Sequence, residues 1–160
     1  MKARTRYAFI GVVALLVVAL VAVVWLRTSR EREARRLVAN YNAALSLAVN
    51  TLDAEKMNDV AAPREKVRVG TYITQLWGED IDLQTELVDL EVLDIRSAEP
   101  TITVLTEELW RNSEGIRSTG EVTSPPADKV QRLQYTLLRD DSGILKVYRA
   151  EILEDQGTLE

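Results

Sequence analysis

The sequence predicts an α+β protein in which an N-terminal transmembrane helix precedes three helices packed on a curved, mostly antiparallel sheet of four or five strands. Three observations carry this prediction. Residues 8–26 form an uninterrupted apolar run, residues 31–78 repeat apolar side chains at helical spacing, and residues 83–153 alternate them with the period of a strand. Helices followed by strands are typical of α+β domains in which the helices cover one face of the sheet.

The apolar run AFIGVVALLVVALVAVVWL carries no charge and would be about 28 Å long as a helix, near the ~30 Å hydrocarbon core of a bilayer. The residues Tyr7, Trp25, Arg27 and Arg30 lie at its ends, and aromatic and basic residues are typical of a membrane interface. A cleaved signal peptide is the alternative, but the run exceeds the usual ~7–15 residues and ends without a small-x-small cleavage site. We expect residues 1–30 to be a tail and an uncleaved single-pass signal anchor.

Charge divides the chain sharply. Residues 1–36 carry eight basic and two acidic side chains, whereas residues 37–160 carry twelve basic and twenty-three acidic ones. Phosphate backbones repel an acidic domain, so nucleic acid is excluded as a partner. The basic residues of the two flanks slightly favour a cytoplasmic domain, whereas a short basic tail before the anchor is typical of the opposite orientation. We expect the second arrangement, with the anchor in the bilayer of the bacterial cytoplasmic membrane and the domain outside the cytoplasm.

Residues 31–153 are expected to form one domain, followed by a disordered tail over residues 154–160. Three helices are predicted in its first half. Apolar side chains recur three and four residues apart over residues 31–52. Asp53 is a suitable N-cap for a second, short helix over residues 54–60. Pro63 suits the first turn of a third helix, which ends near Gly78.

The second half of the domain predicts strands. Alternation over residues 83–95 slips twice, which indicates a long bent strand with bulges near residues 87–88 and 92–93. A second strand follows Pro100 and runs to Trp110. Residues 112–115 are expected to form a turn, residues 116–123 a weak strand and residues 124–128 a mobile loop. Two further strands, over residues 131–139 and 144–153, are joined by the hairpin turn Asp140-Asp141-Ser142-Gly143.

Three segments carry a resemblance to a known superfamily: Thr101-Ile102-Thr103-Val104-Leu105-Thr106-Glu107-Glu108, Gln134-Tyr135-Thr136-Leu137-Leu138-Arg139-Asp140-Asp141-Ser142-Gly143, and Leu145-Lys146-Val147. They resemble the closing strands of nuclear transport factor two-like, or cystatin-like, domains over about residues 34–153. An anchor joined to such a domain is similar to inner-membrane assembly factors of type IV secretion, to Mce-associated membrane proteins and to the intermembrane-space domain of plastid-division proteins. The resemblance implies a cone between helices and sheet, and a role in assembling an envelope complex.

The chain has no cysteine and no histidine, which excludes disulfides, Cys/His zinc sites, thiol nucleophiles and Ser-His-Asp triads. It also lacks a glycine-rich phosphate loop and an Asp-x-Asp-x-Asp-Gly calcium loop. We therefore expect no catalytic residue, no metal and no cofactor.

Enzymes of the superfamily work inside the cone, so its aromatic residues are the candidate pocket: Trp77, Trp110, Tyr135 and Tyr148. A core filled by these side chains is the alternative, and we favour it. Carboxylates are dense along the first strand at Asp82, Glu86, Asp89, Glu91 and Asp94, and a pair of them could do acid–base chemistry if burial raised one pKa. Because charges on a strand usually mark its solvated face, we expect them to face solvent, together with at least one of Glu107 and Glu108.

The predicted function is a non-catalytic, membrane-anchored interaction or assembly module of an envelope complex. Its expected partners are other membrane or envelope proteins or a second copy of the chain. The alternative is a membrane-tethered cone that binds or converts a small molecule, for which Trp110 and Tyr135 would line a cavity.

Overall fold

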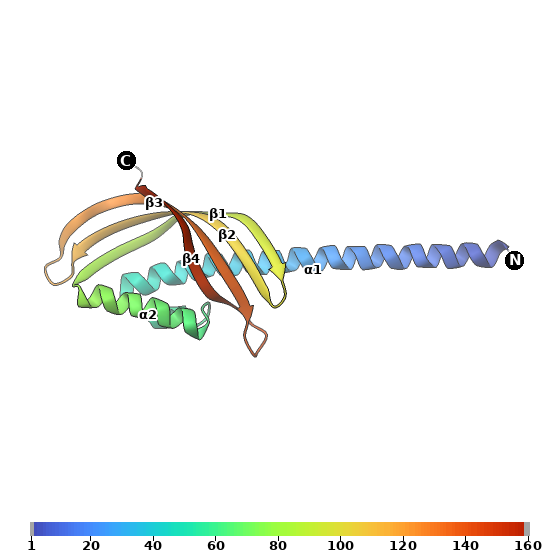
Figure 1. The fold of residues 1–160 in the computed structure, drawn as a ribbon, viewed down its shortest axis with the longest axis horizontal. Helices are drawn as coiled ribbons and strands as arrows, with labels where there is room; N and C mark the ends of the chain where they lie inside the picture. The colour runs from blue at the N-terminus through green and yellow to red at the C-terminus, as the bar shows by residue number, and fades with distance from the viewer. Residues whose placement is uncertain (1, 159–160) are drawn as a thin grey trace. The chain divides into compact units, whose positions relative to one another are not determined.

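The computed structural model describes the backbone of residues 2–158 and the side chains of residues 20–22 and 24–154. Helix α1 (Lys2–Thr51) precedes a 3-10 turn (Ala54–Met57) and helix α2 (Pro63–Gly78). Four strands follow, β1 (Ile81–Ala98), β2 (Thr101–Ile116), β3 (Glu121–Arg139) and β4 (Leu145–Thr158). They form one sheet in the order β1-β2-β3-β4, with every neighbouring pair antiparallel (Figure 1).

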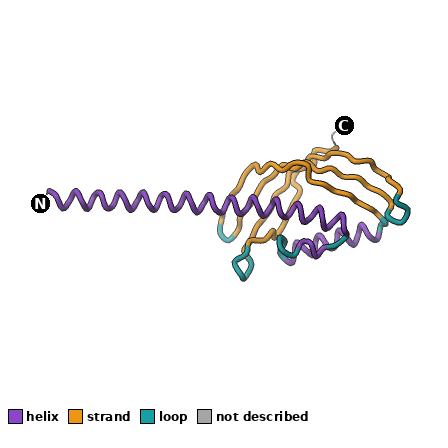
Figure 2. Tube along the Cα trace, turned by 180° about the vertical axis from the view of Figure 1, so that it is seen from behind, coloured by secondary structure: helices purple, strands orange, loops and turns teal. Residues whose placement is uncertain are grey.

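The chain divides into two compact units, Met1–Glu33 and Ala34–Glu160. The second is called the α+β unit below. In it the C-terminal part of α1, from Ala34 to Thr51, and α2 cover one face of the curved sheet (Figure 2). We call this the inner face of the sheet, and the space between it and the helices the cone. The sequence placed the division after residue 30, and that boundary stays a prediction.

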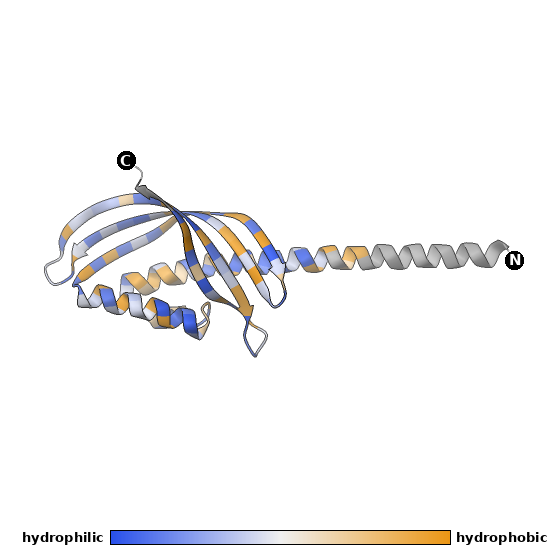
Figure 3. Cartoon of the chain, in the orientation of Figure 1, coloured by the Kyte–Doolittle hydropathy of each residue, from blue (hydrophilic) through white to orange (hydrophobic). Residues whose placement is uncertain are grey.

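The core of the α+β unit lies where the helical stripe of apolar residues meets the inner face. On β2 every second residue from Ile102 to Trp110 is buried, as the two-residue period of a strand requires. On α2 the buried residues Val69, Ile73 and Leu76 recur at helical spacing. Alternating apolar and polar bands along the strands show the same pattern (Figure 3). Burial of these side chains, at about 25 cal/mol per Å² of apolar surface, is the main force holding the helices on the sheet.

The predicted transmembrane anchor is corrected by the structure. Among the residues that it describes, no helix is both long enough and apolar enough to cross a membrane. Helix α1 continues through Thr28-Ser29 without a break. Seven charged residues between Arg27 and Arg36 therefore lie in the same helix as the apolar residues that precede them. The predicted interface residue Tyr7, and the predicted span up to residue 19, lie outside the residues with described side chains. The single-pass and signal-anchor predictions are corrected with the anchor.

The prediction of three domain helices is also wrong, because the α+β unit holds only the end of α1 and α2. Residues 54–57 form a four-residue 3-10 turn, which Asp53 caps by accepting a hydrogen bond from the Glu55 N–H at 3.0 Å. The chain cannot continue as a helix because β4 engages it in an extended form. Val147 donates to the Val60 carbonyl and accepts from the Ala62 N–H, each at 2.8 Å. This strand-like pairing is incompatible with helical backbone at residues 61 and 62.

The strands match the predicted pattern at some points and differ at others. Both predicted bulges of β1 are confirmed, since the pairing with β2 shifts between Leu87 and Asp89 and between Val92 and Asp94. The expected turn at residues 112–115 and the expected loop at residues 124–128 instead lie within β2 and β3. Strand β4 likewise continues to Thr158, where a disordered tail was expected from residue 154.

Candidate functional site

The inner face of β2 carries an unexpected carboxylate. Thr106, Glu108 and Trp110 have the same parity as the buried Ile102 and Val104, so their side chains point into the cone. Glu108 has no exposed surface. An isolated carboxylate in such a position is strongly unfavourable unless hydrogen bonds replace its water. Its neighbours therefore decide what it can do.

Four side chains donate hydrogen bonds to Glu108. Its Oε1 accepts from Asn42 Nδ2 at 2.9 Å, from Thr106 Oγ1 at 2.8 Å and from the Tyr135 hydroxyl at 2.7 Å. Its Oε2 accepts from the indole N–H of Trp110 at 2.8 Å. These donors come from α1, β2 and β3. The carboxylate thus serves as a common acceptor that joins a helix to two strands.

Tyr135 closes the network. Its hydroxyl also lies 2.9 Å from Asn42 Oδ1, so the same phenol contacts both the helix and the carboxylate. Burial, together with the negative charge of Glu108, raises the pKa of Tyr135 well above its ordinary value. The phenol therefore keeps its proton at physiological pH and acts as a donor.

A second buried carboxylate, Glu65, lies at the start of α2. It accepts a hydrogen bond from the Tyr41 hydroxyl at 2.5 Å and pairs with Arg68, whose Nη2 lies 2.5 Å from Glu65 Oε1. The hydrogen bond to Glu65 raises the pKa of Arg68, and burial raises the pKa of Tyr41. Tyr41 also packs edge-to-face against Tyr135, with ring centroids 5.6 Å apart. The two networks therefore meet at these two tyrosines.

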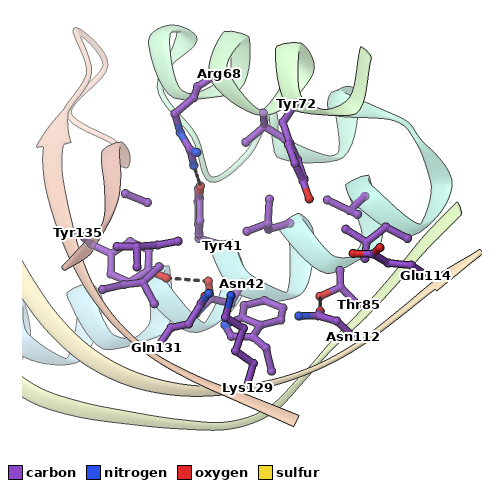
Figure 4. A pocket seen from close by; sticks show the side chains of 18 residues that line it. Tyr41, Asn42, Arg68, Tyr72, Thr85, Asn112, Glu114, Lys129, Gln131 and Tyr135 are labelled. Carbon is purple, nitrogen blue, oxygen red and sulfur yellow. Dashed lines mark hydrogen bonds between the residues drawn. The ribbon is translucent and has the colours of Figure 1, made fainter. Parts of the chain in front are cut away.

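A cavity of about 420 Å³ lies in the cone beside these networks (Figure 4). Its apolar wall comes from Leu45, Val49, Val69, Leu83, Leu133 and Ile152. Its polar groups include Arg68, Tyr72, Glu114, Lys129 and Gln131. Burial and the nearby Glu114 carboxylate raise the pKa of Tyr72, so this phenol is also protonated at physiological pH. The cavity thus has an apolar wall and polar groups that include positively and negatively charged side chains.

The four predicted pocket residues separate into two pairs. Trp110 and Tyr135 are buried and line the cavity. Trp77 is 62% exposed, and the Arg117 guanidinium stacks 3.7 Å from the centroid of its ring. The half-buried Tyr148 accepts a hydrogen bond from Arg64 Nη1 at 3.1 Å, and the same guanidinium lies over its ring. These two aromatic rings contact arginines outside the cavity.

The predicted interface residues lie in the first unit. Trp25 is exposed, and Arg27 donates a hydrogen bond to Glu31 at 3.1 Å. Arg30 is also exposed and takes part in an interaction of its own.

Most of the predicted acidic residues face solvent. On β1 the side chains of Asp82, Glu86, Asp89 and Glu91 are exposed, while Asp94 is half-buried and pairs with Arg96 at 2.6 Å. Glu107 lies on the outer face of the sheet and pairs with Arg132 at 3.0 Å. Its neighbour Glu108 is the buried carboxylate of the cone. Among the described residues, no three Asp or Glu side chains gather as potential metal ligands.

Sequence reasoning missed Asn42 and Glu65, although a signal for each was present. Asn42 stands four residues after Val38 and three before Leu45, on the apolar stripe of its helix. Glu65 stands four residues before Val69 and eight before Ile73. A polar residue at a core position of a helix predicts a buried partner. Which partner it meets depends on the packing of helix on sheet.

No family model matches the chain, and no curated protein matches it. Solved structures do share its fold. The crystal structure of the intermembrane space region of the chloroplast protein ARC6 has a TM-score of 0.67 and 15% identity, covering 76% of this chain and 95% of that one. A structure from Catenulispora acidiphila has a TM-score of 0.50 and 13% identity, covering 82% and 94%. At such identities the likeness shows a similar fold, and this fold resembles that of the ARC6 region.

Proposed function

We propose that the α+β unit acts by contact, as a non-catalytic interaction or assembly module. One observation carries the proposal: the buried carboxylates of the cone are engaged by the protein's own side chains. Both oxygens of Glu108 accept hydrogen bonds, and Glu65 is held by Arg68 and Tyr41. A general acid or base must instead reach the reacting group of its substrate.

The same contacts have a structural purpose that needs no substrate. The Glu108 network connects α1 to β2 and β3, and the Glu65 network connects α1 to α2. Buried polar networks that are fully satisfied favour one arrangement of the packed elements. A rigid unit of this kind presents fixed surfaces to a partner.

The similar fold of the ARC6 region supports an envelope-associated role for such a module. The ARC6 region lies in an intermembrane space, and an envelope setting is proposed for this chain by analogy of fold. The location outside the cytoplasm stays a prediction from the charge pattern.

The following experiment distinguishes a protein that acts by binding a partner from one that acts as an enzyme. The carboxylates of β1 would be changed one at a time in cells that depend on the protein, as Asp82→Asn, Glu86→Gln, Asp89→Asn, Glu91→Gln and Asp94→Asn. We expect each variant to fold and to support growth, or to lose function only together with partner recovery after cross-linking. One variant that loses function while folding and partner recovery are intact would identify a catalytic carboxylate and refute the proposal.

The cavity favours a second candidate, a cone that binds a small molecule. A volume of about 420 Å³ lies within the range of ligand pockets, and Arg68, Tyr72 and Lys129 are among the polar groups that line the cavity beside its apolar wall. Native mass spectrometry of the full chain purified from its own cells would decide between the two. A stoichiometric bound molecule that Tyr72→Phe and Leu83→Trp release would support this candidate.

A further inference from the structure

The sheet has two edges, β1 and β4, because its strand order is β1-β2-β3-β4. The outward N–H and C=O groups of an edge strand can pair with another strand. In this protein each edge is closed at one point by the chain itself.

On β1 a side chain imitates a neighbouring strand. The Thr85 N–H donates to Asn50 Oδ1 at 2.8 Å, and the Thr85 carbonyl accepts from Asn50 Nδ2 at 3.0 Å and from Ser46 Oγ at 2.5 Å. The amide of Asn50 thus occupies both backbone positions that an added strand would need. Helix α1 supplies both of these residues.

On β4 the closure is at Val147, which pairs with Val60 and Ala62. Beyond it, within the described residues, no other element hydrogen-bonds to the outward side of β4. Ala150 and Ile152 pair with Tyr135 and Leu133 of β3, which have the same parity as Leu137, the partner of Val147. Their N–H and C=O groups therefore point away from β3, as those of Val147 do. This part of β4 is an open edge.

The open edge adjoins the cavity. The side chains of Ala150 and Ile152 line the cavity, yet Ile152 remains 57% exposed although it lies on the inner face. Figure 1 shows β4 next to β3, and in the strand order β4 lies at the end of the sheet opposite to β1. A strand added here would direct alternate side chains to the same face. Apolar side chains on those positions would cover Ile152.

Charge indicates the chemistry of such a strand. Residues 34–160 carry fourteen basic and twenty-three acidic side chains, while on β4 beyond its closure Glu151 pairs with Arg149 at 2.5 Å and Glu154 pairs with Arg132 at 3.2 Å. Opposite charges on facing strands are favourable, and like charges are unfavourable. A second copy would bring an equally acidic unit. The net negative charge of the unit therefore favours a basic partner strand.

We propose that β4 beyond Val147 binds an extended segment of a partner protein in which apolar residues alternate with lysine or arginine. The segment adds a fifth strand to the sheet, pairs with the backbone of Ala150 and Ile152, and covers the mouth of the cavity with its apolar side chains. This inference rests on the proposed function and names the chemistry of the partner.

The experiment uses the full chain and a phage-displayed library of random ten-residue peptides. We expect the enriched sequences to alternate apolar and basic residues. One enriched peptide, labelled with fluorescein, would then be titrated with the chain and with two variants. Ile152→Lys places an inward charge on the edge and should weaken binding by at least about tenfold. Leu153→Lys adds the same charge at the next residue, which has no partner on β3 because the pairing shifts there, and should change binding by less than about threefold.

Amide hydrogen exchange locates the contact independently. In the free chain the amides of Ala150 and Ile152 should exchange fast while that of Glu151, which faces β3, is protected. The peptide should protect Ala150 and Ile152. Enriched peptides without the alternating pattern, equal loss in both lysine variants, or binding without protection would each overturn the inference. So would protection that grows with protein concentration alone, because it would assign the edge to a second copy. None of these outcomes bears on partner recovery after cross-linking, which tests the proposed function. The proposed function would therefore stand even if the inference about β4 failed.

Discussion

The hydroxyl of Tyr135 donates a hydrogen bond to Glu108 Oε1 across 2.7 Å, although both residues are completely buried and no cation lies among the four donors to that carboxylate. The pair spans β2 and β3, and Asn42 extends it to α1. The stability of the α+β unit therefore depends on neutral donors that solvate a buried acid. Most of the following predictions test this dependence.

Tyr135→Phe removes the hydroxyl that contacts both Glu108 and Asn42 and keeps the aromatic ring. Because the carboxylate loses a donor that water cannot replace, we expect the free energy of unfolding to fall by about 1–3 kcal/mol. Urea unfolding followed by circular dichroism measures it. Tyr148→Phe is the matched control, since its hydroxyl contacts only the exposed Arg64, and it should cost less than about 0.5 kcal/mol. Equal effects would contradict the prediction.

Glu108→Gln tests the acceptor itself. The amide places an NH₂ group against one of the donors that now face Oε1 or Oε2, so we expect a loss of about 1–3 kcal/mol in the free energy of unfolding. Glu107→Gln makes the same change one residue away, on the outer face, where it weakens only the pair with Arg132 and should cost about 0–1 kcal/mol. A larger loss of unfolding free energy in Glu107→Gln than in Glu108→Gln would contradict the prediction.

Alkaline pH should unfold the protein through its buried phenols. Folding raises the pKa of Tyr41 and Tyr135 above the ordinary value of 10.0. Their contribution to stability is therefore complete below pH 10, where the unfolded chain also keeps both protons, and is lost as the pH rises further. Each phenol should add about 1.4 kcal/mol per pH unit to the slope above pH 10. Urea unfolding between pH 8.5 and 11 measures it, and a slope unchanged in Tyr41→Phe would contradict the assignment.

Asn50→Ala should open the closed edge at β1. Thr85 loses the partner of its N–H and one partner of its carbonyl, so we expect a cost of about 1–2 kcal/mol and loss of exchange protection at the Thr85 amide. Thr51→Ala is the control, because that hydroxyl only bonds back to the Leu47 carbonyl of its own helix. Full protection of the Thr85 amide in the Asn50 variant would contradict the assignment of Asn50 as the group that closes this edge.

The local features that the sequence predicted well depend on contacts between neighbouring residues. The third predicted helix, residues 63–78, corresponds to α2, because Pro63 suits a first turn and the apolar residues repeat at helical spacing. A strand with one buried face must alternate apolar and polar residues with a period of two. The bulges of β1 lie where this alternation slips. The hairpin between β3 and β4 follows from its turn residues, with Gly143 at a φ of 78°.

Other features were decided by pairing with distant segments. Pro125 and Pro126 predicted a loop, yet they lie within β3, where the pairing with β2 is irregular and β4 has not yet begun to pair. Proline is tolerated there because a strand with one neighbour needs fewer N–H donors. The short helix expected after Asp53 is a 3-10 turn instead, and the bridge to Val147 holds residues 61 and 62 in an extended form.

The sequence by itself determined which residues face inward, because the periods of helix and strand assign each side chain to a face. By this periodicity Glu108 shares one side of β2 with Thr106 and Trp110, and Glu65 shares the apolar stripe of α2, although neither carboxylate was predicted to be buried. Only the tertiary structure decided what these carboxylates meet. Asn42, Glu108 and Tyr135 are separated by up to 93 residues, and they converge because α1 crosses the inner face where β2 and β3 pair. Periodicity gives the direction of a side chain, whereas the packing of helix on sheet selects its partner.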